Sequence, residues 1–205
     1  MDKTFWESHW RQARIQATGQ EMPANPHLAI ETRDLEPGTV LDAGCGEGAE
    51  ALWLALQGWA VTAADISREA LARALTRISR AGLSERVRFV EADLSTWQPD
   101  SPFDLVTTHY AHSAIPQLAL YDRISHWVAP GGTLLIVGHL RTPETGHGHG
   151  QPPEEATVTA ASVAATLTPA LWDVVTASEQ VRTSGSPGGA AVELHDVVVR
   201  ATRRL

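Results

Sequence analysis

Three acidic side chains each stand at the end of a short run that has the pattern of a β-strand: Asp42, Asp65 and Asp93. In open α/β sheets, ligands bind beyond the carboxyl ends of the parallel strands. We therefore expect the three carboxylates to meet at one edge of a sheet, where they would stabilise a positively charged ligand. The alternative is that each acid only caps the turn or helix that follows it.

A turn rich in glycine follows the first of these acids, with Gly44, Gly46 and Gly48 at every second position. Such a turn, between a strand and a helix, brings bare backbone close to a small ligand. A pyrophosphate group favours a helix N-terminus without nearby negative charge. Because Asp42 and Glu47 place two carboxylates here, the sequence favours a ligand with a cationic end.

A second class of cofactor also fits the glycines. Residues 44–49 satisfy the degenerate form of the dinucleotide fingerprint, and Asp65 stands at the usual spacing for an acid that binds ribose hydroxyls. An NAD(P)-dependent oxidoreductase is therefore the alternative enzyme class. A third possibility is a non-catalytic module that binds a cofactor as a sensor.

Alternating strands and helices must position these residues. One strand is expected to end at Asp42, and four others are expected to span 59–65, 86–92, 103–109 and 133–139. Helices are predicted at 4–18, 27–35, 49–56, 114–128 and 159–167, and after the N-cap Ser67. This alternation predicts a doubly wound, mostly parallel α/β sheet with right-handed crossovers. Two further strands, about 171–182 and 191–202, predict an antiparallel hairpin at the sheet edge.

Composition limits the classes of partner. The 205 residues predict a single domain, with residues 1–36 as a helical N-terminal part and 140–157 as a mobile surface loop rich in proline and glycine. A net charge of −8 without a basic run argues against nucleic acid and anionic membranes as partners. The single cysteine, Cys45, and the absence of a signal peptide or a membrane-spanning run predict a cytoplasmic protein.

The sequence resembles the class I S-adenosylmethionine-dependent methyltransferases. The resemblance covers about half of the chain, and the matching segments are LDAGCGEG at 41–48, AADIS at 63–67, EADL at 91–94, FDLV at 103–106 and APGGTLLI at 129–136. It implies the Rossmann-like methyltransferase fold, with a seven-stranded sheet and an antiparallel C-terminal strand. It also implies S-adenosyl-L-methionine as the cofactor.

The resemblance implies a role for each matching residue. Asp42, with the backbone of Gly44, Cys45 and Gly46, should hold the methionine end of the cofactor; Asp65 should bind both ribose hydroxyls; Asp93 should bind the adenine amino group, with Ile66 and Leu94 against the ring; and His109 should border the methyl-donor sulfur. We expect Cys45 to be a packed residue and not a nucleophile.

The N-terminus is also similar to the thiopurine S-methyltransferases of bacterial type. The similarity rests on Phe5, Trp6 and Trp10, on the segment 25–28, and on Leu52 to Ala55. It implies that Trp6 closes over the cofactor, so that residues 1–36 act as a lid. The alternative is that both tryptophans pack into the core.

The acceptor is expected to be a small organic molecule, methylated on oxygen, sulfur or nitrogen by in-line displacement. A hydroxyl acceptor needs a general base, for which His112 and His139 are the candidates. We predict no metal site, because His147 and His149 lie in a glycine-rich loop without fixed geometry. The protein is expected to be a monomer or a homodimer.

Overall fold

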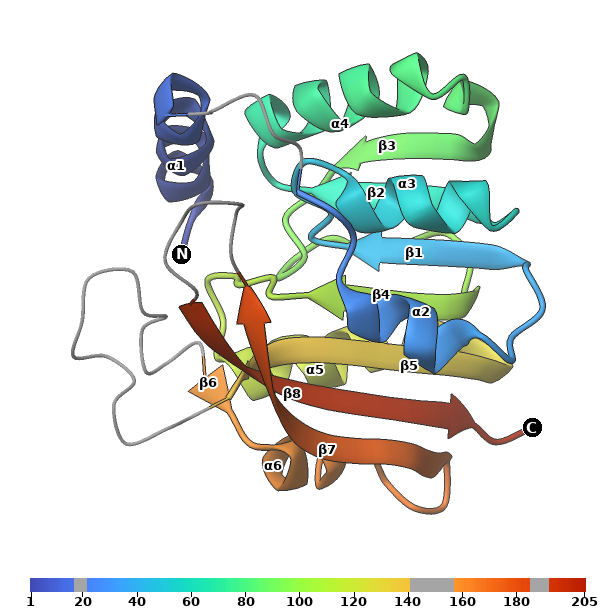
Figure 1. Cartoon of the computed structure of the whole chain (residues 1–205). Helices are drawn as coiled ribbons and strands as arrows, with labels where there is room; N and C mark the ends of the chain where they lie inside the picture. Colours follow the sequence, from blue (N-terminus) through green and yellow to red (C-terminus); the bar gives the residue numbers. More distant parts are fainter. Residues whose placement is uncertain (17–21, 141–156, 185–191) are drawn as a thin grey trace.

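The computed structural model of the chain describes residues 1–16, 22–140, 157–184 and 192–205. Its centre is one twisted sheet in the order β3-β2-β1-β4-β5-β8-β7, with β6 paired to β5 (Figure 1). The strands are β1 (Thr39–Ala43), β2 (Ala60–Asp65), β3 (Val87–Glu91), β4 (Phe103–His109), β5 (Val128–Leu140), β6 (Thr157–Val158), β7 (Trp172–Ser184) and β8 (Val192–Arg203).

The direction of the strands confirms the predicted fold class. Strands β1 to β5 are mutually parallel, β6 is parallel to β5, and β8 runs antiparallel to both β5 and β7. The C-terminal hairpin therefore inserts its second strand between β5 and β7, and β7 becomes the edge strand. The order reverses between β1 and β4, which is the switch point where open α/β sheets bind ligands.

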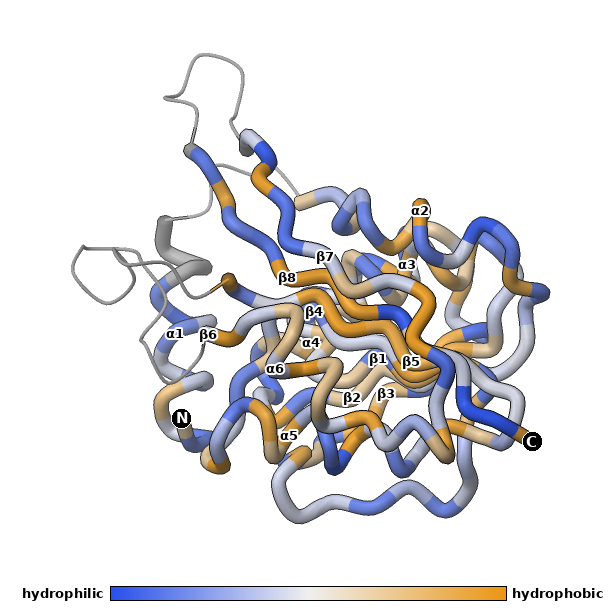
Figure 2. Tube along the Cα trace, turned by 90° about the horizontal axis from the view of Figure 1, so that it is seen from below, coloured by the Kyte–Doolittle hydropathy of each residue, from blue (hydrophilic) through white to orange (hydrophobic). Residues whose placement is uncertain are grey.

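Helices cover both faces of the sheet. They are α1 (Lys3–Gln16), α2 (Pro26–Thr32), α3 (Ala49–Leu56), α4 (Arg68–Arg80), α5 (Gln117–Ser125) and α6 (Ala160–Ala164), with a short 3-10 turn, η1, at Ser84–Arg86. Residues of α2, α3 and α4 form one core with the sheet, and residues of α5 and α6 form a second core on the other face. The apolar strands lie between these helices (Figure 2).

Alternation along β1 divides the strand between the two cores. Val40 belongs to the core under α3 and α4, whereas Leu41 belongs to the core under α5, and both are fully buried. This pattern is the period-2 alternation of a strand whose two faces are both covered by helices. Asp42 continues the alternation and is buried as well, 1% exposed.

The predicted helix caps are present. The Ser67 side chain accepts a hydrogen bond from the backbone N–H of Ala70 at 3.3 Å at the start of α4. Thr159 and Ser162 form a reciprocal capping box at the start of α6. These caps fix where each helix begins, and for α4 that point directly follows the carboxyl end of β2.

The structure differs from the prediction at several boundaries. α5 is shorter than the predicted 114–128, because Pro116 occupies its N-cap position and Val128 already pairs with Phe103 in the sheet. Leu140 and Thr157, predicted as ends of a loop, are strand residues. The loop between them, and the predicted end of the first helix at residue 18, lie outside the described residues. Within the described segments, no helix has both the length and the apolar character needed to cross a bilayer.

Candidate active site

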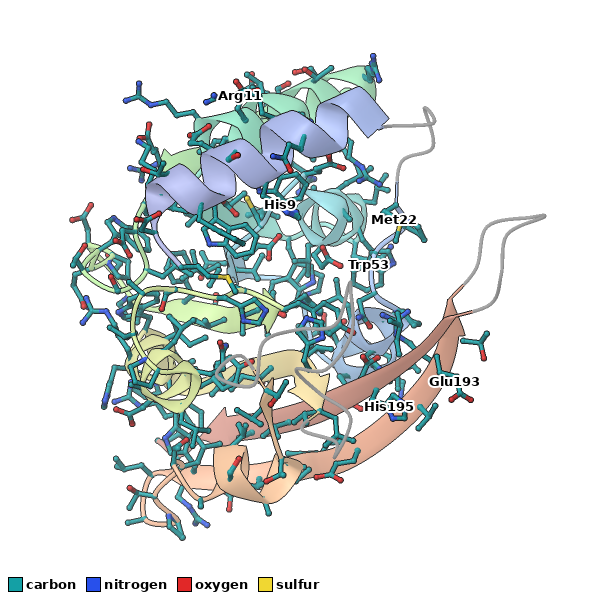
Figure 3. The ribbon with its side chains drawn as sticks, turned by 90° about the vertical axis from the view of Figure 1, so that its left-hand side faces the viewer. His9, Arg11, Met22, Trp53, Glu193 and His195 are labelled. Atoms are coloured by element: carbon teal, nitrogen blue, oxygen red, sulfur yellow. The ribbon has the colours of Figure 1, made fainter. Side chains whose placement is uncertain are left out.

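A cavity of about 700 Å³ opens at the carboxyl ends of the parallel strands. Helix α1 lies at this end of the sheet, and residues 22–25, which precede α2, line the cavity (Figures 1 and 3). The residues that concern the site and line the cavity are Trp6, Trp10, Asn25, Gly44, Cys45, Gly46, Glu47, Glu50, Asp65, Ile66, Arg77, Leu94, His109, Tyr110, Ala111, His112 and Arg182.

Nine of the residues predicted from the sequence meet at this cavity. They are Trp6, Gly44, Cys45, Gly46, Asp65, Ile66, Leu94, His109 and His112. Three others, Asp42, Asp93 and His139, are not among the residues that form its wall. His139 packs against the wall residues His112 and Tyr110, and Asp93 directly precedes the wall residue Leu94. Asp42 is close enough to Glu50 and Asp65, both on the wall, for their charges to act on it.

The glycine turn is constrained by protein neighbours as well as by any ligand. Gly44 and Gly46 both have positive φ, 81° and 51°. A Cβ atom on Gly44 would lie 2.3 Å from the Cβ of Ala111, so no side chain fits there. A Cβ on Gly46 would lie 3.2 Å from Cζ2 of Trp10, which places the α1 tryptophan directly against the turn. The glycines therefore serve packing as well as access.

Asp42 is a buried carboxylate that lacks a complete set of partners. Its Oδ2 atom is buried and has no hydrogen-bond partner among the described residues. Burial, together with the negative charges of Glu50 and Asp65, raises the pKa of Asp42. A cation placed above the turn would relieve this arrangement, so the site is suited to a positively charged ligand.

Asp65 closes the other side of the same turn. Its Oδ2 accepts a hydrogen bond from the backbone N–H of Gly46 at 2.9 Å, and its Oδ1 accepts one from Ser67 at 2.8 Å. Burial raises the pKa of Asp65, although these two hydrogen bonds oppose the shift. The acid thus combines the predicted place beside the cavity with a structural role in holding the turn.

Asp93 lies at the end of β3 and caps the turn that follows. Its Oδ1 accepts hydrogen bonds from the backbone N–H and the hydroxyl of Ser95, at 2.9 and 2.6 Å. This contact is the capping alternative considered for the acid. The next residue, Leu94, lines the cavity and belongs to the core under α5.

Cys45 is 3% exposed and packs in the core under α3. Burial, with the charges of Asp42 and Asp65, raises the pKa of its thiol. A thiol in this state is a poor nucleophile. The structure thus agrees with the interpretation of Cys45 as a packed residue of the turn.

A row of flat side chains runs along the wall beyond His109. The ring centroids are 6.4 Å apart for Trp6 and His112, 5.4 Å for His112 and His139, and 4.6 Å for His139 and Tyr110. Burial lowers the pKa of His112, and it lowers that of His139 to about 4. Both imidazoles are therefore neutral at pH 7, and this row of rings is polar but uncharged.

Hydrogen bonds orient the imidazole of His112. Its Nδ1 lies 2.9 Å from Oε1 of Gln117, and the amide nitrogen of Gln117 donates to the carbonyl of Ala111 at 2.9 Å. This arrangement makes Nδ1 the protonated nitrogen of a neutral ring, since it must donate to Gln117. The second nitrogen, Nε2, is then a proton acceptor, as a general base requires.

His109 is the last residue of β4 and lies on the cavity wall. Its Nδ1 lies 3.4 Å from the hydroxyl of Thr107, and its Nε2 is buried without a partner among the described residues. Burial lowers the pKa of His109. The ring is therefore neutral.

A polar network that the sequence did not reveal anchors Tyr110. The Tyr110 hydroxyl donates to Oδ1 of Asp196 at 2.6 Å and accepts from Asn25 and from Arg182, both at 3.0 Å. Arg182 also donates to Oδ2 of Asp196 at 2.6 Å. Tyr110 has a φ of 54°, which is unusual for a residue other than glycine. No sequence spacing signals this network, because its members come from three segments: Asn25 before α2, Tyr110 after β4, and Arg182 and Asp196 in the C-terminal hairpin.

Charged contacts hold α1 over the site. Glu91 on β3 pairs with both Lys3 and Arg68, the second at 2.5 Å. Arg73 on α4 pairs with Glu47 of the glycine turn and donates to the backbone carbonyl of Trp10. Because Trp6 and Trp10 line the cavity, α1 presents its tryptophans to the site and not to a closed core. In the described part of the chain, no group of three or more metal-ligating side chains is present.

Comparison with known proteins agrees with this geometry. Residues 40–132 match the sequence profile of a methyltransferase domain. The chain is 38% identical over 111 residues to an uncharacterized methyltransferase of Mycobacterium tuberculosis, a match that covers 53% of this chain and 54% of that protein. It thus spans about half the length of that relative. It is 31% identical over 151 residues to thiocyanate methyltransferase 1 of Arabidopsis thaliana, covering 72% and 65% of the two chains.

A solved structure shares the fold over nearly the whole chain. It is the 1,6-didemethyltoxoflavin-N1-methyltransferase of Burkholderia thailandensis with S-adenosylhomocysteine bound, which superposes with a TM-score of 0.66 at 24% identity. The superposition covers 99% of this chain and 87% of that one. Residues 40–132 thus match the methyltransferase domain family, and the overall fold is that of a methyltransferase with S-adenosylhomocysteine bound, in agreement with the resemblance to the class I S-adenosylmethionine-dependent methyltransferases.

Proposed function

We propose that this protein transfers a methyl group from S-adenosylmethionine to a small organic acceptor. The observation that carries the proposal is the buried Asp42, whose Oδ2 has no partner among the described residues, beneath a glycine turn with positive φ. A cofactor with an ammonium and a sulfonium group matches this uncompensated negative charge. The match of residues 40–132 to a methyltransferase domain and the cavity at the switch point of the sheet support the same assignment.

The residues in and beside the cavity match the parts of this cofactor. Asp42 and the backbone of the glycine turn would hold its methionine end, and Asp65 would accept hydrogen bonds from its ribose hydroxyls. Ile66, Leu94 and Asp93 would surround its adenine, and His109 would border its sulfur. Asp93 keeps a second carboxylate oxygen besides the one that Ser95 occupies. When bound, the cofactor supplies a methyl group on a positively charged sulfur.

His112 is our choice as the general base for an acceptor that carries a proton. It lines the cavity, its ring is neutral, and the hydrogen bond to Gln117 leaves Nε2 as a proton acceptor. His139 stacks behind it and is better suited to positioning the ring. A thiolate acceptor would need no base, because positioning alone lowers the barrier of an in-line displacement.

We further propose that α1 acts as a lid. Trp10 lies against Gly46, and Trp6 lies in the row of rings along the wall. Helix α2 has a different role, because its Leu28 is fully buried in the core. We also propose that the protein is a single domain located in the cytoplasm. We propose that it is a monomer or a homodimer and that it binds neither nucleic acid nor membrane. The net charge of −8 and the single cysteine support these proposals.

Binding of S-adenosylhomocysteine, measured by calorimetry, tests the assignment. The wild type should bind, and Asp65→Ala should weaken binding by about 1–3 kcal/mol, the usual cost of losing charge-assisted hydrogen bonds. Asp122→Asn serves as the control, because Asp122 is exposed and pairs only loosely with His126 on α5. Absence of binding to the wild type would refute the function. Binding without any methylated product across thiols, phenols, acids and amines would favour the non-catalytic module.

A further inference from the structure

Arg182 lines the cavity, and none of the contacts proposed for the cofactor involves it. It comes from β7, more than a hundred residues after the glycine turn, and it lies beside Tyr110 at the part of the wall farthest along the row of rings. Its side chain is 26% exposed, so it is partly buried but open to the cavity.

The hydrogen bonds of Arg182 fix one edge of its guanidinium group. Nε donates to Asp196, which is 1% exposed, and Nη2 donates to the hydroxyl of Tyr110. A guanidinium group has more N–H donors than these two bonds use, and Nη1 has no partner among the described residues. A fork that is held on one edge in this way is preorganised to bind an anion with its other edge.

Acidic and basic side chains both line the cavity. Asp65 lies at the glycine turn, whereas Glu50 accepts a hydrogen bond from the backbone of Asn25, whose side chain donates to the Tyr110 hydroxyl. Of the arginines on the wall, Arg77 donates to the carbonyl of Met22 on the α4 side, whereas Arg182 lies beside Tyr110. Asp196 balances the charge of Arg182, but the Nη1 edge of the guanidinium group still offers donors to an anionic group in the cavity.

Three rings lie beside this part of the wall. His139 lies between His112 and Tyr110, stacked on His112 with an interplanar angle of 23° and tilted by 30° from Tyr110. Of the three, His112 and Tyr110 line the cavity, and neither is charged at pH 7, so they add uncharged contact surface beside Arg182.

We infer that the acceptor is a small organic molecule with an anionic group, and that Arg182 binds this group. The inference rests on the proposed function, because it names the acceptor class of the same site. The acceptor's free oxygen or sulfur would point back toward His109. Its lone pair forms the new bond to the methyl carbon, the carbon–sulfur bond of the donor breaks with its electrons going to sulfur, and the proton of a neutral acceptor passes to Nε2 of His112.

The test compares two probes that differ only in charge. We would saturate the protein with S-adenosylhomocysteine and titrate it with 4-hydroxybenzoate and with 4-hydroxybenzamide. The expected result is that the carboxylate binds about tenfold or more tightly than the amide, as a charge-assisted pair of hydrogen bonds predicts. Equal affinities, or binding of neither probe, would overturn the inference. Failure of the proposed function is a separate outcome, because S-adenosylhomocysteine itself would then not bind.

Two variants assign the preference to Arg182. Arg182→Gln alone would leave the buried Asp196 without its ion pair, so it is combined with Asp196→Asn to keep the site neutral. In this double variant the preference for the carboxylate should fall to about unity, while the affinity for S-adenosylhomocysteine stays within about twofold of the wild type. Arg182→Lys keeps the charge and should retain a smaller preference.

A matched control removes an arginine from the same hairpin region. Arg204 pairs with Asp173 at the exposed base of β7, away from the cavity. Arg204→Gln should leave the preference for the carboxylate unchanged. A preference that persists in the double variant, or one that Arg204→Gln removes, would show that Arg182 does not bind the anion.

Discussion

The buried carboxylate of Asp42 has opposite effects on stability and on binding. Because burial raises its pKa, the unfolded chain ionises more readily than the folded one, and the charge destabilises the protein at neutral pH. We predict that Asp42→Asn raises the free energy of unfolding by about 1 kcal/mol or more and weakens S-adenosylhomocysteine binding at least about tenfold. Urea unfolding and calorimetry measure the two effects.

The matched control for this substitution is Asp122→Asn, which removes an exposed carboxylate of α5. It should change neither quantity by more than about 0.5 kcal/mol, as is usual for exposed positions. If Asp42→Asn lost stability and kept full affinity, the carboxylate would be a structural group and not a ligand for the cofactor's ammonium.

His139 should make stability depend on pH. Its folded-state pKa of about 4 lies below the unfolded value of 6.5, so between these values the unfolded chain binds more protons. Stability contributed by the neutral ring is therefore complete above pH 6.5 and is lost as the pH falls toward 4. We predict that His139→Phe, which keeps a ring between His112 and Tyr110, reduces the loss of unfolding free energy between pH 7 and pH 5.

Urea unfolding at the two pH values checks this prediction. The comparison of interest is the difference between the two pH values within each protein, which removes any constant effect of the substitution on packing. An unchanged difference in His139→Phe would mean that other groups carry the pH dependence of stability in this range. The histidine signals in NMR spectra, followed against pH, give the second readout.

At the scale of elements, charged contacts hold α1 against α4 and β3. Glu91 forms ion pairs with both Lys3 and Arg68, and all three side chains are at least a third exposed. Exposed ion pairs contribute little each and are screened by salt. We predict that Glu91→Gln raises the dissociation rate of S-adenosylhomocysteine about two- to fivefold at low salt, and that added salt raises the wild-type rate toward that of the variant.

Stopped-flow fluorescence of the tryptophans measures these rates, because Trp6 and Trp10 line the cavity. Arg204→Gln is the control, since it breaks an exposed ion pair that does not involve α1. Rates that do not respond to Glu91→Gln or to salt would show that α1 opens independently of these contacts, or that it does not cover the cofactor.

Local sequence patterns predicted most of the elements but not how distant segments meet. Asp42 and Asp65 were found because each lies at the end of a strand, and parallel strands end at a common edge. The hairpin was predicted, yet its order was not, because the insertion of β8 between β5 and β7 depends on packing against β5. Asn25, Arg182 and Asp196 were missed for the same reason: only the fold brings them to the hydroxyl of Tyr110.

At the scale of the whole molecule, the site joins segments from both ends of the chain. The network around Tyr110 connects Asn25 before α2 with Arg182 and Asp196 of the C-terminal hairpin. Glu50 of α3 accepts a hydrogen bond from the backbone of Asn25 at 2.9 Å. A ligand in this cavity would therefore stabilise contacts between the first and the last elements of the fold. Its binding should raise the free energy of global unfolding.

This coupling gives a prediction that also separates the two cofactor classes. A ligand that binds only the folded state at about 100 times its dissociation constant adds about 2.7 kcal/mol of stability. For a chain of this size the unfolding temperature should then rise by roughly 5–11 °C with S-adenosylhomocysteine. NADH should produce no rise, because its pyrophosphate would meet Asp42 and Glu47 at the turn. A rise with NADH and none with S-adenosylhomocysteine would reverse the assignment, since both measurements use the same folded protein and the same cavity.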